Sequence, residues 1–87
     1  MSPAYLPAEA VGVIQDGDSV YVANLPRGPI VVLEGTAALV WKAACSGPAD
    51  TLAERVAAAV GEDVAAIETG MAEFIADLVE RGLLAAA

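Results

Sequence analysis

The chain of 87 residues contains no histidine, one cysteine and four basic residues. Because histidine is the usual general base near neutral pH and the commonest metal ligand, its absence argues against most acid–base and metal-dependent catalysis. The lone Cys45 excludes an internal disulfide and any CxxC metal or redox motif. The paired acids Asp16/Asp18 and Glu62/Asp63 fall at an expected turn and helix start, where local hydrogen bonding and the helix dipole favour them. The sequence therefore predicts a protein that is not an enzyme and that has no cofactor or metal.

Positive charge is scarce, with twelve acidic residues against four basic ones and a net charge of −8. Duplex binding draws most of its affinity from Lys and Arg neutralising phosphates, so nucleic acid and anionic membrane surfaces are excluded as partners. No uninterrupted apolar run approaches the roughly 18 residues of a membrane-spanning helix. Residues 1–9 also lack the basic flank and apolar run of a signal peptide. We therefore expect a cytoplasmic location and no membrane partner.

Apolar residues, in contrast, make up 57% of the chain, which is enough to form a core. The length allows one domain. We expect an N-terminal arm over residues 1–8, a folded domain over residues 9–84 and a tail over residues 85–87. A domain this small buries a modest fraction of its surface, so the excess of apolar residues suggests that some of them face a partner.

The first half of the chain is rich in Val and Ile and is interrupted by two turn signals. Asp16-Gly17 predicts a tight hairpin, because Gly accepts positive φ. Pro26-Arg27-Gly28 predicts the second turn. The segments between these turns are expected to be strands over residues 10–15, 19–25 and 29–33.

The second half predicts three helices. Gly47-Pro48 ends the first helix, and Thr51 with Glu54 matches a capping box that opens the second. Gly82 is placed to cap the third helix, with Leu83-Leu84 folding back as an apolar anchor. The helices are expected over residues 35–44, 51–60 and 63–81. The order β-β-β-α-α-α predicts an α+β, winged-helix-like fold, in which a three-stranded antiparallel sheet precedes three helices.

The third strand is the segment that points to a function. Pro29 cannot donate to a ladder, which favours an edge position for this strand. Residues 30–33 carry no charge, and an apolar edge is normally an aggregation hazard. One explanation is that an incoming extended peptide pairs with this edge. The alternatives are that residues 1–8 cover the edge or that a second copy does, as in an edge-paired or domain-swapped homodimer.

The third helix offers an apolar surface on which such a peptide could gain side-chain specificity. Met71 is adaptable because its thioether is flexible. Gly70 costs about 1 kcal/mol relative to Ala in a helix, and either admits another backbone or packs against the first helix. The same helical stripe is also compatible with an ordinary core. From the strand and this helix, the candidate peptide-binding residues are Ile30, Val31, Val32, Leu33, Ile67, Gly70, Met71 and Phe74.

Four segments together resemble a known family. They are VYVAN (20–24), VLEGTAALVW (32–41), TLAERV (51–56) and FIADLVERGLL (74–84). Their order and spacing resemble PqqD-like domains, also called RiPP recognition elements, which act on ribosomally made, modified peptides. The resemblance implies a peptide chaperone without catalytic activity, whose partners are the leader segment of a precursor peptide and a modifying enzyme: a radical SAM enzyme, a cyclodehydratase or a leader peptidase. It also implies that the leader adds to the third strand and lies against the third helix, where the matching positions include Ile75 and Leu78 as well.

The chain departs from this family pattern at two places. Glu34-Gly35 stands where many members have Asn or Asp, and Pro26–Pro29 shortens the preceding strand. Both departures concern which peptide is bound.

Other functions fit the sequence less well. A winged-helix transcription regulator needs basic residues on its recognition helix. The third helix instead ends at a single Arg81 and carries Glu68, Glu73, Asp77 and Glu80. An acyl carrier protein needs a serine at a helix start, and the nearest match, Asp18-Ser19-Val20, opens a strand. An acidic protein-interaction module without a leader-peptide role remains an alternative.

Overall fold

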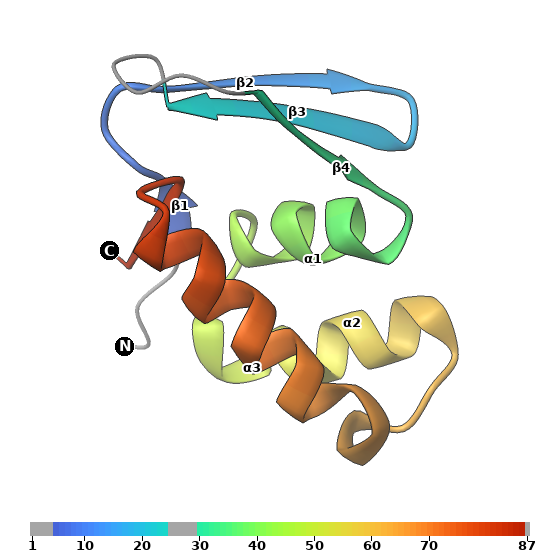
Figure 1. Ribbon diagram of the computed structural model, residues 1–87. Coiled ribbons are helices and arrows are strands. Elements are labelled where there is room, and N and C mark those ends of the chain that lie inside the picture. The colour runs from blue at the N-terminus through green and yellow to red at the C-terminus, as the bar shows by residue number, and fades with distance from the viewer. Residues whose placement is uncertain (1–4, 25–29, 87) are drawn as a thin grey trace.

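The computed structural model describes residues 5–24 and 30–86 (Figure 1). A three-stranded antiparallel sheet of order β2-β3-β4 is followed by three α-helices, which confirms the expected fold class. The expected turn at residues 26–28, and the expected strand ends at Leu25 and Pro29, lie outside the described residues. The elements in chain order are β1 (Tyr5–Pro7), β2 (Val11–Asp16), β3 (Ser19–Asn24), β4 (Ile30–Glu34), α1 (Thr36–Ala44), the 3₁₀ helix η1 (Ala49–Thr51), α2 (Leu52–Val60), α3 (Val64–Glu80) and β5 (Leu84–Ala86).

A two-residue turn fixes the register of the sheet. Gly17 has φ of +60°, and Asp16 pairs with Ser19 across the turn. This is the hairpin geometry in which glycine at the first turn position matches the twist of the strands. β3 then pairs with β4 so that Val20 lies opposite Leu33. Side chains alternate between the two faces, which places Val20 and Leu33 in the core.

The core lies between the inner face of the sheet and the helices. In Figure 1 the sheet lies over α1, and α3 crosses on the other side of α1. Trp41 of α1 is the largest fully buried side chain, at 1% exposure. The buried hydrophobic cluster consists of Val20, Val22, Leu33, Ala38, Val40, Trp41, Ala44, Leu52, Val56, Ile75, Leu78, Leu83 and Leu84.

The expected helix ends are confirmed, but the capping box is wrong. Gly61 and Gly82 have φ of +72° and +74°, the left-handed conformation that ends helices. Thr51, however, is the last residue of η1, with φ −106° and ψ 3°, so it lacks the extended backbone of an N-cap. Its hydroxyl donates to the Pro48 carbonyl at 3.4 Å and accepts from Arg55 Nε at 3.2 Å instead.

A second, two-stranded sheet joins the two ends of the described chain. β1 pairs with β5 in antiparallel register, with Leu6 opposite Ala85. The Ala8 amide also donates to the Leu83 carbonyl at 3.1 Å. The sequence analysis placed no pairing in either segment, because strands of three residues are too short to show a hydrophobic period. The pairing has a consequence for β4, since residues 5–7 are engaged with β5 and do not cover the β4 edge.

Candidate peptide-binding site

β4 is an edge strand. Among residues 5–24 and 30–86 it pairs with β3 alone. This agrees with the edge position expected from the sequence, and it leaves one side of the β4 backbone without a strand partner in the described structure. β2 forms the opposite edge of the same sheet.

The register identifies which backbone groups of β4 face the open side. In a two-residue hairpin the closing pair, here Asp16 and Ser19, is hydrogen-bonded, and hydrogen-bonded and non-bonded pairs then alternate. The backbone groups of Val20 and Val22 therefore point to β4, where their partners are Leu33 and Val31. The amides and carbonyls at the three remaining positions point to the open edge. These positions are Ile30, Val32 and Glu34.

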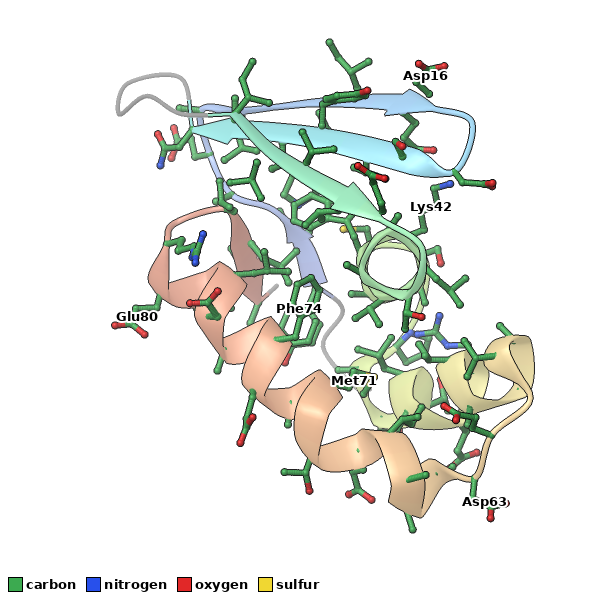
Figure 2. The ribbon with its side chains drawn as sticks, turned by 45° about the vertical axis from the view of Figure 1, so that its right-hand side comes forward. Asp16, Lys42, Asp63, Met71, Phe74 and Glu80 are labelled. Atoms are coloured by element: carbon green, nitrogen blue, oxygen red, sulfur yellow. The ribbon has the colours of Figure 1, made fainter. Side chains whose placement is uncertain are left out.

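An apolar groove lies between α1, α2 and α3. Its volume is about 320 Å³. Figure 2 shows Met71 and Phe74 projecting from the side of α3 that faces α1 and α2. Both side chains are partly buried and pack against the core. The lining residues are Thr36, Ala37, Val40, Val56, Ala66, Ile67, Gly70, Met71 and Phe74.

Four of the candidate residues on α3 therefore line one groove: Ile67, Gly70, Met71 and Phe74. The contribution of α1 was not predicted from the sequence, although its Ala37 and Val40 belong to the same lining. The almost continuous apolar sequence of α1 concealed which of its residues face the groove. Thr36 follows the end of β4 by two residues, so the groove begins close to that strand.

Gly70 leaves open space in this groove. A Cβ atom built at Gly70 would meet no heavy atom within 4 Å. The alternative in which Gly70 packs against the first helix is therefore wrong. The residue costs helix stability without a packing contact, which is consistent with the need for a clear surface at this point.

Other candidate residues point into the core instead. Ile75 and Leu78 are 6% and 2% exposed, and Leu33 is 4% exposed. Their side chains hold α3 and β4 in place. A docked peptide could not reach them without displacing the core, so we do not include their side chains among the contacts proposed below.

The surroundings of the site are acidic. Glu73 and Glu80 on α3 are exposed, and Asp77 forms an ion pair with Arg81 at 3.0 Å between side chains that are about half exposed. Such an exposed i,i+4 pair contributes little to stability. Arg55 is also engaged, because its guanidinium donates to the Ala43 carbonyl at 2.7 Å and to the Pro48 carbonyl at 2.9 Å.

The lone thiol of the chain, Cys45, is partly buried. Burial raises the pKa of the Cys45 thiol above its ordinary value, which disfavours the nucleophilic thiolate. Within residues 5–24 and 30–86, no three His, Cys, Asp or Glu side chains are grouped to hold a metal ion. In that same part of the chain, no helix is both long enough and apolar enough to cross a membrane.

Comparison with known proteins identifies a family. No curated protein and no solved structure matches the chain. The sequence model of one family, described as coenzyme PQQ synthesis protein D (PqqD), matches residues 15–84. The match includes β4, all three α-helices and the buried Leu83-Leu84 pair. Since it covers most of a chain whose sheet and helices follow in the expected order, the chain belongs to the PqqD family.

Proposed function

We propose that this protein binds the leader segment of a ribosomally made precursor peptide by β-strand addition to β4 and presents it to a modifying enzyme. The PqqD family consists of non-catalytic, peptide-binding chaperones in the synthesis of coenzyme PQQ and of other modified peptides. The observation that carries the proposal is the open β4 edge. The strand is followed two residues later by Thr36, which belongs to the lining of the apolar groove of α1, α2 and α3. Strand addition needs both features, because backbone hydrogen bonds supply affinity and side-chain pockets supply specificity.

The two edges of the sheet are not equivalent as docking positions. β4 packs on α1 and leads directly into it through Gly35, whose φ of +58° makes the sharp change of direction. β2 lies on the far side of the sheet from α1 and α3 (Figure 1). A peptide on β4 would therefore lie closer to the helices and their groove than a peptide on β2.

The test is titration with synthetic leader peptides of ribosomally made precursor peptides, followed by NMR of the backbone amides. We expect the largest shifts at Ile30, Val32 and Glu34 and along the groove face of α3. Met71→Glu places a carboxylate in the apolar groove and should weaken binding by at least about tenfold, since burying an unpaired charge is costly. Thr69→Glu adds the same charge to an exposed position on the same helix outside the groove, and should bind as the wild type does.

Shifts confined to β2, or equal affinities for these two variants, would contradict the docking position. Absence of any binding at millimolar peptide would contradict the function itself.

Gly70→Ala gives an independent prediction, because its effects on stability and on binding should have opposite signs. The added methyl group meets nothing in the free protein, so the free energy of unfolding should rise by about 0.5–1 kcal/mol. The same methyl group protrudes into the groove and should lower peptide affinity several-fold. Chemical denaturation and calorimetric titration measure the two quantities. An unchanged affinity in the stabilised variant would mean that the peptide does not approach Gly70.

A further inference from the structure

The outer face of the sheet, directed away from the helices, carries an apolar surface. Ile14, Ile30 and Val32 are 67%, 65% and 46% exposed, respectively. Burial alternates along β4, where Val31 and Leu33 face the helices and Ile30 and Val32 face outward. Monomeric proteins rarely leave contiguous apolar residues in water without a function for them.

The strand register joins these side chains into one surface. Ile14 lies opposite Tyr21, and Tyr21 lies opposite Val32. Beside this row, the small side chain of Ala23 lies opposite Ile30. The resulting hollow has a volume of about 300 Å³ and is lined by Gly12, Val13, Ile14, Tyr21, Ala23 and Ile30. This apolar surface reaches the open edge of the sheet at Ile30 and Val32.

A strand added to β4 would extend the same face. The residues that bond to the open backbone groups of Ile30, Val32 and Glu34 lie directly opposite them and project their side chains to the same outer face. Directly opposite side chains have Cβ atoms roughly 5 Å apart, and apolar pairs and opposite-charge pairs at that distance are favourable. An added strand thus meets two apolar side chains and then one carboxylate on its outer face.

We propose that the outer face of β4 selects the bound peptide through three alternating positions: apolar opposite Ile30, apolar opposite Val32 and basic opposite Glu34. The inference rests on the proposed function and adds to it the class of peptide recognised. Because antiparallel pairs are slightly more stable per residue than parallel ones, the peptide runs opposite to β4 and has the order basic-x-apolar-x-apolar. Its intervening residues face α1 and α3, so the peptide is apolar on both faces.

The charge of the chain favours this peptide. Glu34 is exposed, and the one ion pair in the described residues joins Arg81 to Asp77 on α3. Lys42, the cation of α1, donates to the Gly17 carbonyl at 3.3 Å. With a net charge of −8 the whole chain also attracts a cationic segment, and this attraction raises the association rate more than the final affinity.

The experiment is selection of a displayed library of random twelve-residue peptides on the full chain and on three variants. The wild type should enrich basic-x-apolar-x-apolar peptides that fail to bind Val32→Pro. Glu34→Lys should replace the basic preference by an acidic one. For two peptides that differ only in a basic or an acidic residue opposite position 34, the ratio of affinities should change by about 3- to 10-fold. Val32→Thr should weaken the apolar preference at the middle position. Ile14→Thr changes an equally exposed residue of the same face two strands away, and should leave the selected sequences unchanged.

The outcomes separate the two proposals. In one outcome the selected peptides fail to bind Val32→Pro and yet show the same sequence preferences with the wild type and with Glu34→Lys. That result would overturn the outer-face inference and leave leader binding intact. Enrichment of the reverse order, apolar-x-apolar-x-basic, would overturn the antiparallel orientation. If no selected peptide is sensitive to Val32→Pro, strand addition at β4 is wrong, and the inference that depends on it is wrong as well.

Discussion

Val32→Pro should weaken binding of the leader peptide by at least about 100-fold while the protein stays folded. The amide of Val32 points to the open edge, so proline removes a donor that the β3–β4 ladder does not use. An added strand would lose that hydrogen bond, would leave its own carbonyl unpaired and would meet the proline ring. These effects together cost about 3 kcal/mol or more, which corresponds to the loss of affinity. Isothermal titration calorimetry measures the affinity, and circular dichroism checks the fold.

The matched control is Gln15→Pro on the opposite edge of the sheet. Gln15 is exposed and lies in a non-hydrogen-bonded pair with Val20, so its amide also points away from the sheet. This variant carries the same backbone change and should bind the leader peptide normally. Equal affinities of the two folded proline variants would contradict addition at β4.

Hydrogen exchange tests the same point without a substitution. In the free protein the Val32 amide should exchange fast and the Val31 and Leu33 amides slowly, because the latter two are bonded to β3. Bound peptide should slow exchange at Val32. Fast exchange at Val32 in the saturated complex would exclude a strand partner at that position, whatever the stability of the proline variant.

Trp41→Ala should have the largest effect on stability. Trp41 is 1% exposed and lies in the cluster that joins the sheet to the helices. Truncation of a buried Trp to Ala typically costs about 3–5 kcal/mol through lost burial and the cavity that remains. The total stability of a domain this size is about 5–10 kcal/mol. We therefore expect the Tm to fall by roughly 15–30 °C, or the variant to be partly unfolded at 25 °C.

Thermal denaturation followed by circular dichroism measures this effect. Tryptophan fluorescence cannot be used, because Trp41 is the only tryptophan of the protein. Trp41→Phe keeps much of the apolar volume and should lose less than Trp41→Ala. Val79→Ala removes a side chain that is 44% exposed on α3 and should change stability by no more than about 0.5 kcal/mol. A Trp41→Ala loss as small as that of Val79→Ala would mean that α1 is not the centre of the core.

Local sequence signals predicted the elements well wherever one residue type dictates the backbone. Gly17 and Gly82 each take positive φ, at the hairpin turn and the helix end where the sequence predicted a change of direction. The capping box failed because the neighbouring 3₁₀ helix, rather than Thr51 itself, sets the backbone at the start of α2. A match to the capping-box motif considers residue types alone and takes no account of the backbone conformation of the preceding residues.

The candidate site was predicted in part. Helical spacing correctly placed Ile67, Met71 and Phe74 on the inward side of α3. Spacing alone did not separate them from Ile75 and Leu78, because groove and core residues on one helix share the same apolar stripe. Exposure and the position of the neighbouring helices distinguish the two sets.

Local pattern and composition were enough to predict the order of the three sheet strands and three α-helices, the acidic net charge and the uncharged run over residues 30–33. The folded structure was needed to show which side of β4 is open, that β1 pairs with β5 and that Gly70 faces empty space. The physical reason is that strand partners and cavities depend on contacts between segments far apart in the chain, and no local sequence period encodes such contacts.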